Sequence, residues 1–416
     1  MIFPLPANNL YGNEPIPIEI PEDWEVTICE YAGVDAPPMN YEQIAAAIAA
    51  PTGAQPIAQA AQGKKDAIII IDDISRPTPM EDIAKAVIAE LEQAGVPRNK
   101  IRFLAAVGSH RAMSREDFVR KLGEDIVQEF RMYSHNPFFN NVSLGTTSTG
   151  VPIELNAEAV AADFKIAIGN AVPHGNVGIA GGPKIILPGI ASMESIKGLH
   201  AAKTARWDLS APGQGIAAEA AAALGLDFKI DVLLNGKGEI SKLYAGDVNA
   251  LAAAHLDEIR DFYRTPHIMD ADIVLANNYF KPSEPFLSIA YNGLVFSVKK
   301  GGSLIVSSHS PQGAAPHYAQ GQWGDAGIGG PLYNLTPVAR RLKTYYAFST
   351  FQDLGTAAGY HFAGDNVKWV SKWEEIVAAE GPDKKVLAIY PHGSVGYYGD
   401  TGNVIKNGPS NPPVAK

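Results

Sequence analysis

Short apolar runs alternate with amphipathic stretches along most of this chain. Residues 67–71 are five consecutive apolar residues, a pattern typical of a strand buried on both faces of a sheet. The stretch that follows repeats its apolar positions with a helical period and ends at Gly95. The segment TPME at residues 78–81 predicts a capping box with proline at the first helical position. A strand followed by a helix is therefore expected here.

The same scheme repeats further along the chain. Residues 101–107 predict a strand, and Ser114 with Asp117 predicts the cap of a helix that ends before Gly123. Residues 164–170 predict a third strand, and a short helix begins after Ser192. Regular alternation of this kind predicts an α/β fold with a mostly parallel sheet flanked by helices.

Polar residues follow the predicted strands at their carboxyl ends, the edge where ligands bind to parallel sheets. Asp72 and Arg76 follow the first strand, His110 the second and His174 the third. We therefore expect these four side chains to lie near one ligand site.

The alternation restarts after the helical stretch around residues 250–264. Strand-like runs follow at residues 272–277, 303–308 and 386–391. We therefore predict two α/β domains, residues 1–264 and 265–416, each with a mostly parallel sheet flanked by helices and with the active site in the interdomain cleft. Further loop residues are of undetermined role; they are His309, His317, Trp323 and His392.

Composition narrows the classes of partner and compartment. The chain has 416 residues, 46% of them hydrophobic, with a net charge of -10 spread along its length. This charge argues against nucleic acid or an anionic membrane as a partner. Neither an export signal nor a membrane-spanning run is recognisable, and the single cysteine, Cys29, fits a reducing compartment. A cytoplasmic protein that binds a small molecule is expected.

The segment from Gly169 to His200 concentrates the candidate chemistry, with two histidines and Lys184 among many glycines. The histidine spacing matches no short zinc signature, although one histidine could complete a metal held by a cofactor's own donors. The sequence GIAGGPK lacks the Walker spacing, and GxGxxG is absent. Any nucleotide must therefore be bound by another arrangement.

Five motifs resemble the lactate racemase family and occur in the order found there. They are DDISRPTP (residues 72–79), GSHRAMSRED (108–117), PHGNVG (173–178), GGPKIILPGIA (181–191) and GLH (198–200). The resemblance is close in the N-terminal domain and looser beyond it. It implies an isomerase that inverts C2 of a 2-hydroxy carboxylic acid by reversible hydride transfer to a nickel-pincer nucleotide.

The resemblance also implies roles for individual residues. Lys184 would carry the nickel-pincer nucleotide covalently, and His200 would ligate the nickel. His110 and His174 would be the paired acid/base residues, two of them because the enantiomers present their hydroxyls on different sides. Asp72 and Arg76 would hold the cofactor or the substrate anion. Cofactor biosynthesis proteins would be partners during maturation.

The chain departs from the lactate enzymes in the C-terminal domain. Those enzymes have a glutamine and, three residues later, a lysine, where this chain has Ser288 and Tyr291 at or near the same positions. We therefore expect a 2-hydroxy acid other than lactate, with these two residues near the substrate. The alternatives are a metal-dependent hydrolase or lyase that uses the same histidines, and a non-catalytic cofactor-binding homologue.

Overall fold

The computed structural model describes residues 1–7, 9–174, 178–201, 212–283, 294–311, 342–351 and 365–398. The chain forms two compact units: unit 2 spans Asp35–Arg260, and unit 1 combines Met1–Val34 with the chain from Asp261 onward. The boundary after Arg260 lies close to the expected boundary after residue 264, but residues 1–34 belong with the C-terminal part. The reason is a strand near the N-terminus that pairs within the sheet of unit 1.

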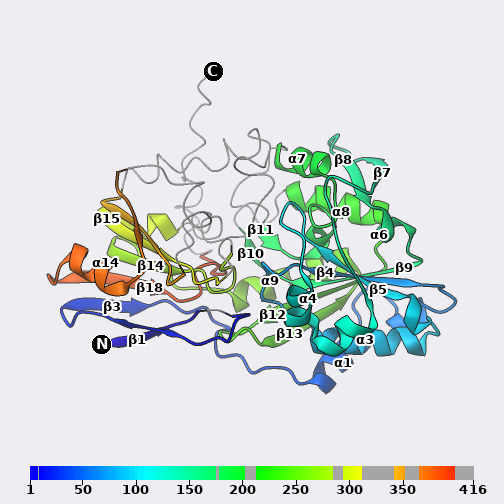
Figure 1. The fold of residues 1–416 in the computed structure, drawn as a ribbon, viewed down its shortest axis with the longest axis horizontal. Helices are drawn as coiled ribbons and strands as arrows, with labels where there is room; N and C mark the ends of the chain where they lie inside the picture. The colour runs from blue at the N-terminus through cyan, green and yellow to red at the C-terminus, as the bar shows by residue number, and fades with distance from the viewer. Residues whose placement is uncertain are drawn as a thin grey trace. The chain divides into compact units, whose positions relative to one another are not determined.

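Unit 2 is built on a six-stranded sheet, and Figure 1 labels most of its strands. In spatial order they are β13 (Ile240–Gly246), β12 (Phe228–Leu234), β9 (Phe164–Asn170), β4 (Ala67–Asp72), β5 (Ile101–Ala106) and β6 (Arg131–Ser134). All neighbours are parallel except β12 and β13. Every residue of β4 and β9 is buried, as the continuous apolar run predicts for β4.

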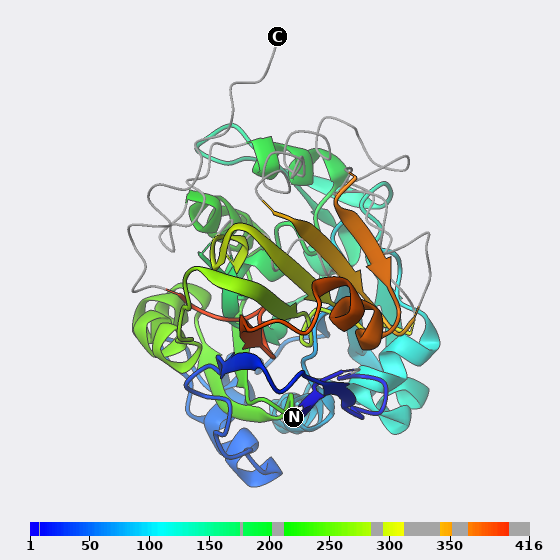
Figure 2. The ribbon, with the colours of Figure 1, turned by 90° about the vertical axis from the view of Figure 1, so that its left-hand side faces the viewer.

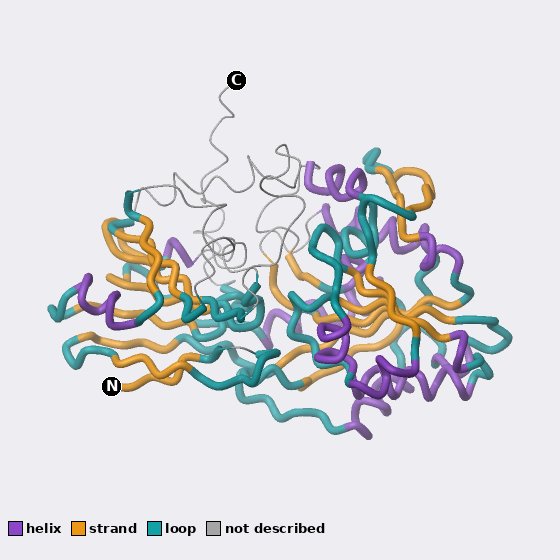
Figure 3. The backbone as a smooth tube through the Cα atoms, in the orientation of Figure 1, coloured by secondary structure: helices purple, strands orange, loops and turns teal. Residues whose placement is uncertain are grey.

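Helices lie on both sides of this sheet, as Figure 3 shows. They are α1 (Tyr41–Ala49), α2 (Ile57–Ala60), α3 (Glu81–Gln93), α4 (Arg115–Leu122), α5 (Glu124–Glu129), α6 (Ala157–Ala161), α7 (Met193–Ala201), α8 (Pro212–Leu224) and α9 (Val248–Phe262), with short 3₁₀ turns at Arg98–Lys100 and, as η2, at Gly182–Ile185. Two hairpins complete the unit: β7 (Asn141–Thr146) with β8 (Pro152–Asn156), and β10 (Val172–His174) with β11 (Gly178–Ala180).

Unit 1 contains a second six-stranded sheet in which all neighbours are parallel. The order is β17 (Val367–Val370), β16 (Thr344–Phe348), β15 (Val298–Ser307), β14 (Ala271–Asn277), β18 (Lys385–Tyr390) and β3 (Trp24–Ile28). One face packs against α14 (Trp373–Glu380) and the hairpin of β1 (Ile2–Leu5) with β2 (Ile16–Glu19). The other face packs against η3 (Leu294–Phe296) and the buried Cys29. Figure 2 views this unit from its own side.

The mostly parallel α/β fold predicted from the sequence is therefore confirmed. The cap of α4 is also confirmed, because Ser114 and Asp117 form a reciprocal capping box and Gly123 ends the helix with a φ of +82°. The predicted cap of α3 is wrong: Met80 is its N-cap, and no side chain caps it. No helix in the described part of the chain is long and apolar enough to span a membrane.

Candidate functional site

Three adjacent strands of unit 2 end where the candidate residues begin. The order β9, β4, β5 brings the carboxyl ends of the three predicted strands side by side. Asp72 is the last residue of β4, and His110 lies in the turn that follows β5. The sequence therefore predicted correctly that these segments meet at one edge of the sheet.

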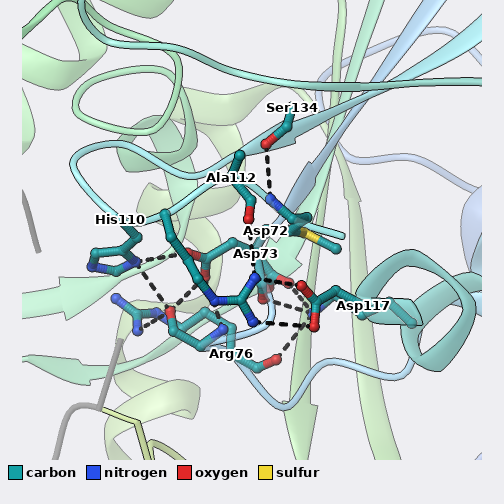
Figure 4. Close-up of polar contacts among 11 residues, drawn as sticks. Asp72, Asp73, Arg76, His110, Ala112, Asp117 and Ser134 are labelled. Atoms are coloured by element: carbon teal, nitrogen blue, oxygen red, sulfur yellow. Dashed lines mark hydrogen bonds and ion pairs between the residues drawn. The ribbon is translucent and has the colours of Figure 1, made fainter. Parts of the chain in front are cut away.

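Asp73 and His110 form a hydrogen-bonded pair at this edge, shown in Figure 4. The Nδ1 of His110 lies 2.6 Å from Oδ2 of Asp73, and 12% of the His110 side chain is exposed against 6% of the Asp73 side chain. Because an ionised carboxylate only accepts hydrogen bonds, Nδ1 must carry the proton and Nε2 carries the lone pair of the neutral ring. This geometry suits an imidazole that accepts a proton at Nε2.

The Asp73 carboxylate is kept ionised by its neighbours. Burial raises its pKa, but the charges of His110 and Arg76 and the hydrogen bonds from His110 and Ser75 outweigh burial, so the net shift is downward. The backbone N–H of Ser75 donates to Oδ1 over 3.1 Å, and the Ser75 hydroxyl donates to the same oxygen. Asp73 is thus available to stabilise a protonated His110.

Asp72 has a different environment from its neighbour. Its Oδ1 accepts a hydrogen bond from Lys121 Nζ at 2.5 Å, and its Oδ2 accepts one from the Thr78 hydroxyl at 2.5 Å. Burial raises the pKa of Asp72 despite the opposing effects of Lys121 and Thr78. The predicted role of Asp72 in ligand binding stays a prediction, while the structure assigns both of its oxygens to internal contacts.

Two arginines flank the pair. The Nη1 of Arg76 donates to the Ser75 hydroxyl over 3.0 Å, and its partly exposed side chain lies in the turn that follows Asp73. Arg111 instead forms a two-pronged ion pair with Asp117, at 2.6 Å and 3.2 Å. The positive charge of Arg76 acts on Asp73 from this turn, and a guanidinium at this place suits an anionic ligand.

The loop that carries Lys184 packs directly against the turn that carries His110. The N–H of Gly108 donates to the carbonyl of Gly189 over 2.8 Å. A Cβ on Gly189 would lie 2.0 Å from the Ile185 carbonyl oxygen, and one on Gly181, where φ is +99°, would lie 2.4 Å from the Asn170 carbonyl oxygen. Close backbone approach therefore requires glycine at both positions.

His200 lies in the last turn of α7, with its ring held by the backbone. Its Nδ1 is 2.7 Å from the carbonyl oxygen of Ile196, so Nδ1 carries the proton and Nε2 the lone pair. Burial lowers the pKa of His200; the hydrogen bond to Ile196 opposes this effect, and the positive charge of Lys184 adds to it. A neutral imidazole with its Nε2 lone pair is the form that ligates a metal.

These residues fit a metal whose other donors come from a cofactor. The structure offers one imidazole lone pair at His200, and the positive charge of Lys184 contributes to the lowered pKa of that ring. Among the residues that the structure describes, no three histidine, cysteine, aspartate or glutamate side chains are grouped so that they could hold a metal ion.

Other predicted residues are placed only in part. The backbone of His174 pairs with Gly178 in the β10–β11 hairpin, but its side chain lies outside what the structure describes. Four more lie outside the described residues; they are Ser288, Tyr291, His317 and Trp323. Both His309 and His392 are buried within unit 1, where Nδ1 of His392 lies 2.9 Å from Glu30.

Sequence reasoning missed three residues of the site. Asp73, rather than Asp72, faces His110, and Lys121 and Thr78 hold Asp72. The signal available for Asp73 was the doublet of aspartates at a strand end, because consecutive residues of a strand point to opposite faces. No sequence signal marked Lys121, which reaches the turn from the next helix along the sheet.

Comparison with known proteins agrees with the motifs. Residues 11–210 match the family model described as the lactate racemase N-terminal domain. The chain is 30% identical to lactate racemase from Lactiplantibacillus plantarum over 275 residues, which is 63% of this chain and 64% of that enzyme. It is 27% identical to lactate racemase from Thermoanaerobacterium thermosaccharolyticum over 319 residues, or 73% and 74% of the two chains.

Solved structures extend the likeness in fold to almost the whole chain. The lactate racemase apoprotein from T. thermosaccharolyticum matches with a TM-score of 0.70 at 20% identity, covering 95% of this chain and 99% of that one. A protein from Thermotoga maritima matches with a TM-score of 0.64 at 18% identity, covering 86% and 97%. The chain is thus similar in sequence to the lactate racemase N-terminal domain and to two lactate racemases, and it shares the fold of the solved structures.

Proposed function

We propose that this protein is a racemase or epimerase that inverts C2 of a 2-hydroxy carboxylic acid by reversible hydride transfer. The observation that carries the proposal is the Asp73–His110 pair, which lies beside the loop of Lys184 at the ligand-binding edge of the sheet. The similarity to lactate racemases supports the same reaction class. Inversion by direct proton removal would place a carbanion beside an ionised carboxylate, which is electrostatically unfavourable.

In this proposal, Nε2 of His110 accepts the proton of the substrate's C2 hydroxyl as C2 loses its hydrogen. Asp73 keeps the ring oriented through Nδ1 and stabilises the imidazolium that forms. The resulting 2-oxo acid is planar at C2 and can regain hydrogen on either face. His174 is the corresponding acid/base residue for the other enantiomer, and Arg76 grips the carboxylate.

The proposed cofactor is a nickel-pincer nucleotide. His200 would ligate its nickel through Nε2, and Lys184 would tether it covalently; the hydrogen bond at Nδ1 of His200, which leaves the Nε2 lone pair available, supports the first assignment. When bound, this group supplies the acceptor and donor of the hydride. The protein orients the substrate, excludes water and holds the hydroxyl proton.

The proposed substrate is a 2-hydroxy acid other than lactate, such as a sugar acid or a bulkier hydroxy acid. This part rests on the absence of the lactate enzymes' glutamine and lysine from the segment with Ser288 and Tyr291. A pocket built from different residues favours a substrate of different size or polarity.

The test is to produce the protein in a host that makes the cofactor, and then to measure intact mass, nickel content and inversion of a panel of chiral 2-hydroxy acids. We expect added mass on the peptide with Lys184, about one nickel per chain, and inversion of at least one acid. Lys184→Ala should lose the added mass and His110→Asn the activity, while His255→Asn, a helix α9 control, should change neither. An unmodified Lys184 with nickel that a chelator removes would favour a metal-dependent hydrolase or lyase instead. Full loading without inversion of any acid would favour a cofactor-binding protein.

A further inference from the structure

Two buried lysine–aspartate pairs lie beneath the proposed site. We propose that Lys121–Asp72 and Lys229–Asp231 form one charged floor: Lys121 positions the turn of Asp73 and Arg76, and Lys229 positions the loop of Lys184. None of the four is proposed to touch substrate. The inference concerns positioning for the proposed reaction and rests on that function for its catalytic part.

The first pair ties down the turn after β4 at three points. Lys121 Nζ lies 2.5 Å from Oδ1 of Asp72, 3.0 Å from the carbonyl oxygen of Asp73 and 2.9 Å from that of Arg76. An ammonium group has three donors, so these contacts use all of them. The Lys121 side chain is fully buried. Removing it would release both ends of the turn that orients Asp73 toward His110.

The second pair holds the start of the Lys184 loop. Lys229 Nζ, also fully buried, lies 2.7 Å from Oδ1 of Asp231 and 2.6 Å from the Ile230 carbonyl oxygen. The other carboxylate oxygen of Asp231 accepts the N–H of Gly182 over 2.9 Å. Gly182 begins the 3₁₀ turn that contains Lys184. The Asp231 carboxylate thus connects the buried ammonium group of Lys229 to the backbone of the loop that contains Lys184.

Gly169 on β9 brings the two pairs together. A Cβ built on this residue would lie 3.6 Å from Oδ2 of Asp72 and 3.8 Å from Nζ of Lys229. An atom of each pair therefore lies within 4 Å of one point beside β9. Both pairs follow from the same sheet register, in which Gly169 faces Asp231 on β12 and Ile168 faces Ile71 on β4.

Positioning explains this floor better than stability does. Two charges removed from water lose hydration that their attraction only partly restores, so a buried pair contributes little net stability unless its other hydrogen bonds are satisfied. Here three of those remaining hydrogen bonds go to the backbone of the two functional loops. The arrangement fixes where the loops lie, and a shift of about 1 Å in a catalytic group can cost about 100-fold in rate.

The experiment compares Lys121→Met and Lys229→Met with Lys165→Met. Lys165 is a matched control, because it is also buried but lies near the amino end of β9, where its Nζ donates to the Ala162 carbonyl over 2.6 Å. A second pair of variants, Lys121→Met with Asp72→Leu and Lys229→Met with Asp231→Leu, removes each ion pair whole. These double variants leave no uncompensated buried charge, so in the same measurements they replace a single variant that does not fold.

For Lys121→Met in the loaded enzyme, we expect kcat to fall about 10- to 100-fold while KM changes little, and the acid limb of the pH profile to move to lower pH. That limb should move because His110, without a well-placed Asp73, loses the carboxylate that stabilises its protonated form. For Lys229→Met, we expect a several-fold smaller fraction of chains with mass added at Lys184. Unchanged kcat, pH profile and Lys184 modification in folded variants would overturn the proposal.

Amide hydrogen exchange of the unloaded protein tests the floor independently of activity. The Gly182 amide, which donates to Asp231, should exchange faster in Lys229→Met, whereas the Gly108 amide should exchange as in wild type. If the wild type neither inverts any acid nor takes up the cofactor, the proposed function fails, yet this measurement still decides whether the floor holds the loop. Equal exchange of Gly182 in wild type and variant would refute the positioning role.

Discussion

Acidification should weaken unit 2 through His135, a buried histidine next to the site. Only 2% of His135 is exposed; its Nε2 lies 2.9 Å from the carbonyl oxygen of Ala191, and its Nδ1 lies 3.2 Å from the side-chain nitrogen of Asn156. The ring must be neutral in this setting, because it donates through Nε2 and accepts through Nδ1. Burial lowers the pKa of His135 to about 4, against a weaker opposing effect of the Ala191 carbonyl.

The sign and size of the effect follow from linkage. The unfolded chain binds a proton at His135 below about pH 6.5, whereas the folded chain resists it down to about pH 4, so stability falls as the pH drops between those values. At 1.36 kcal/mol per pH unit of difference, the loss is about 2 kcal/mol between pH 7 and pH 5, and about 3 kcal/mol by pH 4. The lowered pKa values of Asp73 and Asp117 act mainly below about pH 5.

The assay measures urea unfolding at pH 7 and pH 5 by hydrogen exchange of the β9 amides, so that only unit 2 is followed. His135→Gln keeps a donor and an acceptor but does not titrate, and His255→Gln on α9 is the control. We expect the free energy of unfolding of wild type and control to fall about 2 kcal/mol more than that of His135→Gln. The same pH dependence in all three proteins would refute the reasoning.

Three further changes have definite expected outcomes. Asp73→Asn should lower kcat on the order of 10²- to 10⁴-fold and move the acid limb of the activity profile to lower pH, because His110 loses its charged partner; steady-state kinetics against pH measure both. Gly189→Ala should sharply lower the melting temperature, because the new Cβ would lie 2.0 Å from the Ile185 carbonyl oxygen; an unchanged melting temperature would contradict this packing. Ser114→Ala should lower the free energy of unfolding of unit 2 by about 1 kcal/mol through loss of the α4 cap, measured by urea unfolding at pH 7.

The parts of the site that could be predicted from sequence depend on local pattern. A continuous apolar run identified β4, residues 164–170 were also predicted as a strand, and the strand ends correctly indicated the sheet edge that carries His110. The local pattern could not predict which of Asp72 and Asp73 pairs with His110, because Asp72 is held by Lys121, which lies in a helix further along the chain. Thr78 does not cap α3 because the helix begins at Glu81 with Met80 as its N-cap, and the Thr78 hydroxyl donates to Asp72.

The division of the chain into units failed at the N-terminus for a related reason. Local periodicity assigns residues 1–34 to the nearest domain along the sequence. The structure instead pairs β3 with β18, so that Trp24 faces Lys385 and Ile28 faces Ile389. A pairing between strands from the two ends of a chain leaves no signal in either sequence, because the alternation of apolar and polar residues in a strand does not depend on which strand it pairs with.

One rule of ring chemistry separates the two described histidines of the site. Both commit Nδ1 to an acceptor and keep the lone pair on Nε2, but the acceptors differ: the ionised Asp73 for His110 and the neutral Ile196 carbonyl for His200. A carboxylate stabilises the imidazolium and so suits a residue that must take up a proton. At His200, burial and the charge of Lys184 disfavour protonation although the hydrogen bond to the Ile196 carbonyl favours it, and a ring that stays neutral suits a residue that presents a lone pair to a metal. The surroundings of each ring, namely the carboxylate beside His110 and the burial and positive charge around His200, therefore determine which of the two proposed tasks each histidine suits.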